Sequence, residues 1–69
     1  MTPAEFSAAL AILGWSLREL ARRLGCDVAL PARWSKGTAF VPQPIAAWLR
    51  KLAAGVGRQP VPEWRVRAQ

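Results

Sequence analysis

Glycines divide the first half of this chain into short segments that can each form one helix. Gly14, Gly25 and Gly37 each follow a run of helix-forming residues. A glycine after the last turn readily takes the left-handed conformation that ends a helix. Because an isolated helix shorter than about 12 residues is marginal in water, each segment needs partners that cover an apolar face. The spacing therefore restricts the chain to a bundle of short helices.

Two of the segments begin with capping signals. In TPAE, residues 2–5, the threonine can cap a helix whose first residue is proline, and the glutamate can bond back to the cap. SLRE, residues 16–19, has the same spacing of a hydroxyl and a glutamate. Trp15 precedes the second cap and is expected to pack on Leu20 as a hydrophobic staple. Both patterns predict helices, ending at Gly14 and Gly25.

A third and a fourth helix are expected downstream. The third can begin directly at Asp27, a good N-cap, or later with Leu30 at the boundary, and it runs to about Ser35 or Lys36. Pro31 predicts a frayed or tightened first turn. The fourth begins within residues 42–44 and runs to Ala54. Apolar residues recur with the i, i+3, i+4, i+7 spacing of one helix face in three of the four segments. These core candidates are Phe6, Ala9, Leu10 and Leu13; Leu17, Leu20, Ala21 and Leu24; and Ile45, Trp48, Leu49 and Leu52.

The sequence thus predicts an all-α fold, a compact bundle of four short helices over residues 1–54. The loop at 38–44 offers Phe40 and Val41 as further core residues. Residues 55–69 form a Gly/Pro-rich basic tail that is extended or flexible, an arm or a dimerisation segment. Trp64 either folds back on the core of its own chain or is buried in a second subunit. The remaining candidates for arm or dimer contacts, or for a solvated end, are Arg58, Arg65 and Arg67.

Charge is the bulk property that says most about partners. Ten Lys and Arg face four Asp and Glu among 69 residues, a net charge of +6. A small domain with this much positive charge usually binds a polyanion. A domain of this size buries only about 60% of the surface that its unfolded chain exposes, so a partner subunit could add burial.

Catalysis, metal binding and membrane insertion have little support in the residues. The chain has no His and no Tyr, its four acids show no paired spacing, and one cysteine, Cys26, has no histidine to activate it. We therefore expect no enzyme, no metal site and no cofactor. No apolar run approaches the roughly 20 residues of a membrane span. The N-terminus lacks the basic region of a secretory signal, and the single cysteine is compatible with a reducing compartment, so the expected location is cytoplasmic.

The stretch LRELARRLGCDVALPARWSKG, residues 17–37, meets the packing demands of a helix–turn–helix. Ala21 supplies a small residue where the second helix crosses, and Gly25 supplies the tight turn. Trp34, with Leu30 or Pro31, can hold the second helix against the first.

Residues 2–54 resemble the Cro/cI-type, or lambda-repressor-like and Xre-like, helix–turn–helix domain of small bacterial and phage regulators. The order and spacing of residue types in this family are similar to those in three segments of the chain, GWSLRELARRLG, ARWSKG and VPQPIAAWLRKLA. The resemblance implies a homodimer that binds double-stranded DNA at a palindromic operator and regulates transcription. We expect it to act as a repressor. It implies base contacts from Val28, Ala29, Ala32 and Arg33, and phosphate contacts from Ser16, Leu17, Arg18, Arg22 and Lys36.

Other interpretations remain beside this one. Arg18, Arg22 and Arg23 clamp phosphates or form a solvated face, since Glu19 stands four residues before Arg23. The same fold could instead serve as a protein-binding module, an anti-activator or anti-repressor that binds another regulator through the apolar residues 28–30. The net charge of +6 favours DNA over this alternative.

Overall fold

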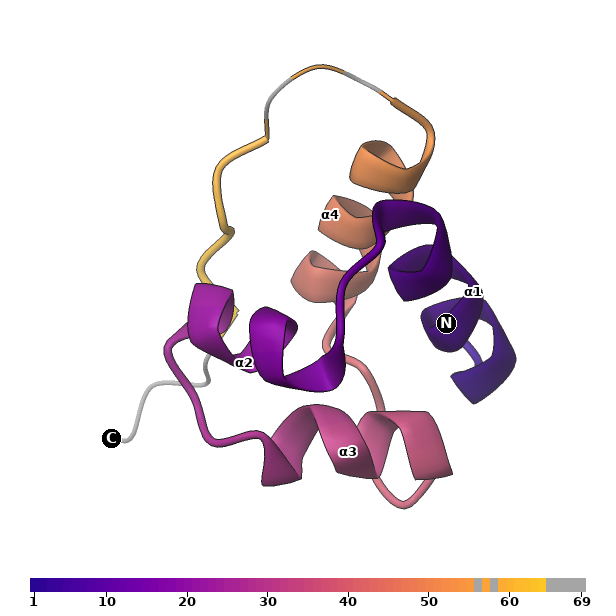
Figure 1. The fold of residues 1–69 in the computed structure, drawn as a ribbon, viewed down its shortest axis with the longest axis vertical. Coiled ribbons are helices and arrows are strands. Elements are labelled where there is room, and N and C mark those ends of the chain that lie inside the picture. The colour runs from indigo at the N-terminus through magenta and orange to yellow at the C-terminus, as the bar shows by residue number, and fades with distance from the viewer. Residues whose placement is uncertain (56, 58, 65–69) are drawn as a thin grey trace.

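The computed structural model describes residues 1–55, 57 and 59–64. Within these residues the chain forms four α-helices and no β-strand. The helices are α1 (Pro3–Leu13), α2 (Leu17–Leu24), α3 (Ala29–Lys36) and α4 (Gln43–Ala53). Helices α1 and α4 pack side by side, and α3 lies across one end of the molecule against α1 and α2 (Figure 1). The all-α, four-helix expectation is confirmed.

Local hydrogen bonds explain where the first two helices begin. The Thr2 hydroxyl accepts from the Glu5 backbone N–H at 3.1 Å, and the Thr2 N–H donates to the Glu5 carboxylate at 2.8 Å, so the capping box of α1 is complete. At α2 the Ser16 hydroxyl accepts from the Glu19 N–H at 3.0 Å. The return bond of the second box is replaced, because the Glu19 carboxylate pairs with two arginines of its own helix.

The first turn of α3 lies between the two starts that the sequence left open. The helix begins at Ala29, two residues after Asp27, and the Asp27 carboxylate accepts from the Ala29 N–H at 2.8 Å. The Asp27 carbonyl, which a regular helix would pair with residue 31, accepts from the Leu30 N–H at 3.1 Å. Pro31 therefore removes no hydrogen bond, and the tightened first turn is confirmed.

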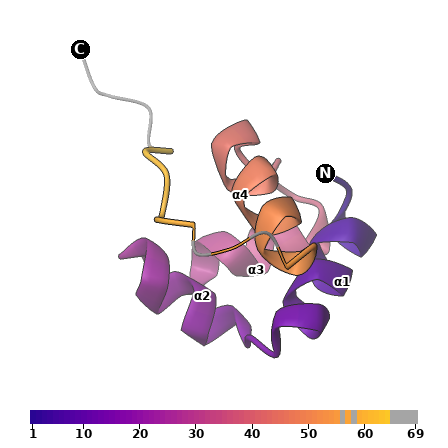
Figure 2. The same ribbon diagram turned by 90° about the horizontal axis from the view of Figure 1, so that it is seen from above.

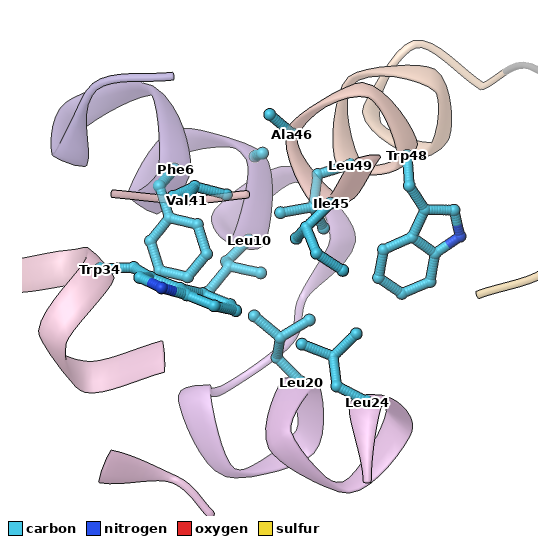
Figure 3. Close-up of a cluster of buried hydrophobic side chains, with 11 residues drawn as sticks. Phe6, Leu10, Leu20, Leu24, Trp34, Val41, Ile45, Ala46, Trp48 and Leu49 are labelled. Atoms are coloured by element: carbon cyan, nitrogen blue, oxygen red, sulfur yellow. The ribbon is translucent and has the colours of Figure 1, made fainter. Parts of the chain in front are cut away.

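A continuous apolar core joins all four helices. Trp34 of α3 is 2% exposed and meets the Phe6 ring edge-on, with ring centroids 5.8 Å apart. Figure 3 shows the Phe6 ring over the Trp34 ring, with Leu20 and Leu24 of α2 lower down and α4 side chains to the right. The residues buried in this core are Phe6, Ala9, Leu10, Leu20, Leu24, Trp34, Val41, Ile45, Ala46, Trp48 and Leu49.

The loop before α4 corrects one expectation. Val41 is buried as expected, but Phe40 is 96% exposed, so the expected placement of Phe40 in the core was wrong. Residues 40 and 41 lie outside any helix, and of the two side chains only that of Val41 enters the core.

The tail returns to the bundle after α4 (Figures 1 and 2). The Trp48 indole N–H donates to the Gln59 carbonyl at 3.1 Å. Trp64 meets Trp34 edge-on, with ring centroids 6.0 Å apart. Of the two alternatives for Trp64, the structure has the one in which it folds back on its own chain. Arg58, Arg65 and Arg67 lie outside the described residues.

Candidate nucleic-acid interface

A tight corner joins α2 to α3 and sets the relative position of the two helices. Gly25 has φ 70°, and the N–H of Cys26 donates to the Ala21 carbonyl at 3.0 Å, which closes the end of α2. Ala21 is buried at 4% exposure, and Cys26 packs against the edge of the core. Residues 25–28 thus connect two packed helices with little freedom between them.

Helix α3 has one buried face and one exposed face. Pro31 and Trp34 are buried, and Leu30 is half-buried against the core. The opposite side of the helix spans an arc of about 100°. We call it the α3 stripe, and it consists of Ala29, Ala32, Arg33 and Lys36.

The α3 stripe brings together most of the expected base-contacting residues. Ala29, Arg33 and Lys36 are exposed, and Ala32 is half-buried. Val28 stands just before the helix, with 39% of its surface exposed. The stripe combines small apolar side chains with two cations, and no acid occurs between residues 28 and 62 of the sequence. The stripe itself therefore carries two positive charges and no negative one.

The cationic residues expected to contact DNA fall into two groups, those that form an ion pair within the chain and those that do not. Arg22 is committed to an ion pair, with its guanidinium 2.6 Å from the Glu19 carboxylate. Within the described residues, Arg18, Arg33 and Lys36 form no ion pair with an acidic side chain, and all three are exposed. They can meet an external anion without first breaking an internal contact.

Glu19 accounts for the difference between the groups. Its carboxylate also accepts the Arg23 guanidinium at 2.8 Å, and that guanidinium lies 4.3 Å from the centre of the Trp15 ring. The hydrogen bond from Arg22 holds the pKa of Glu19 below its ordinary value of 4.5 and raises the pKa of Arg22. Trp15 packs on Trp48 at 5.7 Å between ring centroids, a pairing that the expected staple did not include.

Ser16 and Leu17 have limited side-chain capacity for phosphate. The Ser16 hydroxyl already accepts the capping bond from Glu19, and Leu17 is half-buried against the core. The backbone N–H groups of a first helical turn lack partners within the helix, so main-chain donors are what this end of α2 can offer. Among the expected residues of α2, only Arg18 presents a free cation in the described part of the chain.

Two sequence signals could have sharpened the expected site. Glu19 precedes Arg22 by three residues and Arg23 by four, and both spacings favour ion pairs on a helix, which separates these arginines from Arg18. The acid-free run from 28 to 62 also leaves the cations of α3 and α4 with no acid on their own helix. No comparable signal marks Phe40 as exposed.

Comparison of the chain with family models, with curated proteins and with solved structures found no match. Across the described residues no helix is long and apolar enough to cross a membrane. In the same part of the chain, no three His, Cys, Asp or Glu side chains gather where they could hold a metal ion.

Proposed function

We propose that this protein is a sequence-specific DNA-binding regulator of transcription, acting as a homodimer and most simply as a repressor. The observation that carries the proposal is the α3 stripe, an exposed helix face beside a tight α2–α3 corner, whose two cations form no ion pair within the described residues. A helix has the right diameter to enter the major groove of B-DNA. The resemblance to Cro/cI-type domains supports the same use of α3.

In this proposal each residue of the stripe has a distinct task. Arg33 donates a bidentate pair to the O6 and N7 of a guanine, which discriminates by about 1–3 kcal/mol against another base. Val28, Ala29 and Ala32 make apolar contact with thymine methyl groups. Arg18 and Lys36 contact phosphates and set the register of the helix in the groove.

A single α3 stripe gives limited discrimination, because it has one side chain able to make a bidentate base contact. A dimer doubles the number of contacts on a two-fold operator. A dimer bound over a promoter represses by steric occlusion, which needs no chemistry beyond binding.

The first test is selection of bound duplexes from a random pool at near-physiological salt. Enrichment of a palindrome is expected. Binding is also expected to weaken steeply with salt, with a log–log slope of about −0.9 for each phosphate neutralised.

Arg33→Ala is expected to lower affinity for the selected duplex by about 10-fold or more and to flatten the preference at one base pair in each half-site. Arg50→Ala is the matched control, because it removes the same charge from an exposed position on α4. Quantitative binding of both variants to the selected duplex and to single-base variants measures the difference.

Equal effects of Arg33→Ala and Arg50→Ala would reduce the role of α3 to general electrostatics. Failure of the folded protein to bind any duplex would favour the alternative, a helix–turn–helix protein that binds another regulator. The exposed Val28 beside Ala29 is the observation that favours this second candidate.

A further inference from the structure

Phe40 is the most exposed large apolar side chain in the described part of the chain. It is 96% exposed, compared with 68% for Ile12 and 39% for Val28. An aromatic ring left in water loses the favourable free energy of burial that such a side chain normally contributes. An exposed ring of this kind marks a surface that a partner can cover.

An apolar groove lies directly beside Phe40. Its volume is about 340 Å³, and its walls come from the start of α1, the end of α3 and the loop that follows α3. No Asp, Glu, Lys or Arg side chain lines it. Besides Phe40, the walls include Met1, Pro3, Trp34, Ala39 and Val41.

We propose that a second copy of this chain covers this surface, with Phe40 of each copy seated in the groove of the other. Because the Phe40 ring and the groove are neighbours, a two-fold axis between them can place the ring of each copy opposite the groove of the other. The same patch then serves both subunits, as in an isologous dimer.

The area involved suits a modest dimer. An aromatic side chain buries about 150–250 Å², and each insertion covers a similar area of groove wall, so two insertions remove roughly 600–1,000 Å² from water. Stable specific interfaces begin near 1,200 Å² in total, and the rims of the two patches can add the remainder. We therefore expect association at micromolar concentration.

Charge favours a second copy at this surface over other faces of the molecule. With a net charge of +6, two copies repel each other wherever basic side chains meet. The groove lacks charged side chains in its lining, so apolar burial here is opposed less by that repulsion than at faces that carry arginine or lysine.

The position of the patch connects it with the proposed function, on which its biological role rests. Gly37 and Trp34, at the C-terminal end of α3, belong to the groove. The C-terminal end of α3 therefore lies at this surface, and in a two-fold dimer formed here each α3 would have that end toward the axis. This is the kind of arrangement that a palindromic operator requires.

The test is sedimentation equilibrium of the full chain without DNA, from low to high micromolar concentration. Phe40→Ser is expected to raise the dimer dissociation constant by about 30-fold or more, because a central aromatic residue dominates a small interface. Its circular dichroism and melting temperature should stay those of the wild type, since the ring has almost no contacts to lose within the chain. Ile12→Ser is the matched control, an exposed apolar residue on α1, and should leave the dissociation constant unchanged.

A mixing experiment tests the reciprocal geometry. Ala39→Arg places a charge in the groove and should also give monomers. In an equimolar mixture, the ring of the Ala39→Arg chain can still enter the groove of the Phe40→Ser chain, which lacks only its own Phe40 wall, so heterodimers should reappear. Two variants that are monomeric alone and associate when mixed would support the exchange of Phe40 between copies.

Several results would overturn the inference. These are a wild-type chain that stays monomeric throughout, a Phe40→Ser chain that dimerises as well as the wild type, or dissociation by Ile12→Ser instead. A monomeric wild type whose binding to a short duplex weakens on Phe40→Ser would assign the ring to DNA. Conversely, a Phe40-dependent dimer that binds no duplex would support this inference while the proposed function fails.

Discussion

At the scale of single residues, one carboxylate decides which arginines of α2 are available. Glu19 pairs with Arg22 and Arg23, and Arg23 also stacks on Trp15. Arg18 lies on the same helix and has no such partner among the described residues. Electrostatic contacts within α2 therefore separate structural arginines from an arginine that is free to meet an anion.

Glu19→Gln is expected to flatten the dependence of stability on pH. The pKa of Glu19 in the folded chain lies below its ordinary value of 4.5, chiefly because Arg22 donates to it. Its stabilisation is therefore complete above the ordinary pKa and is lost as the pH falls through the lower, folded value. Urea titrations between about pH 6 and about pH 3 should show the wild type losing more stability than the variant.

The effect of Glu19→Gln should be small, because the pair is exposed to solvent, and should shrink further in high salt. Glu5 has a pKa lowered by its bond to the Thr2 backbone and stays in both proteins, so it cancels in the comparison. Parallel pH curves for the two proteins would contradict the assigned role of Glu19.

At the scale of elements, α3 accommodates a proline that appears disruptive in the sequence. Pro31 is the third residue of the helix, and the carbonyl that its missing N–H would have used already accepts from Leu30. Its ring is fully buried beside Trp34. In this position the proline acts as a core residue and not as a helix breaker.

Pro31→Ala is accordingly expected to destabilise the protein by about 2 kcal/mol. Two buried methylene groups contribute about 0.8 kcal/mol each, and the unfolded chain gains the freedom that proline had removed. Pro44→Ala is the control, because Pro44 is an exposed residue in the first turn of α4. Thermal and urea unfolding of both variants measure the difference, and a more stable Pro31→Ala chain would contradict this account.

At the scale of the whole molecule, the tail contacts two indole rings of the helical core. Gln59 accepts from the Trp48 indole, and Trp64 meets the edge of Trp34. Trp34 in turn meets Phe6 of α1, so a row of aromatic contacts links the tail to the first helix. The tail is part of the folded unit in the region that the structure describes.

Trp64→Ala is expected to lower the free energy of unfolding by about 2 kcal/mol, less than the 3–5 kcal/mol of a fully buried tryptophan because Trp64 is half-buried. For a domain of this size the melting temperature should fall by roughly 8–16 °C. Val61→Ala, an exposed apolar change in the same tail, should have little effect. Ending the chain after Ala54 should cost at least as much as Trp64→Ala, and an unchanged melting temperature would refute the role of the tail.

Much of the fold was predictable because its determinants are local. The capping pattern at Thr2 and the left-handed glycines place the helix ends within a residue or two, and the 3.6-residue period identifies most of the core. The sequence left the start of α3 open between Asp27 and Leu30, and the structure begins the helix at Ala29, after a turn that the Asp27 side chain caps. For the candidate site, the sequence predicted which face of α3 would be exposed, since that face is the complement of Pro31 and Trp34.

By itself the sequence determined the four helices, the corner at Gly25 and the net charge of +6, because caps, turns and charge depend on residues close together in the chain. Only the tertiary structure decided that Phe40 stays in water while Val41 is buried, and that Trp64 packs on Trp34 of its own chain. These outcomes depend on which surfaces distant segments have already filled. The physical reason is that burial is a property of packed neighbours, and neighbours far apart in sequence leave no local pattern.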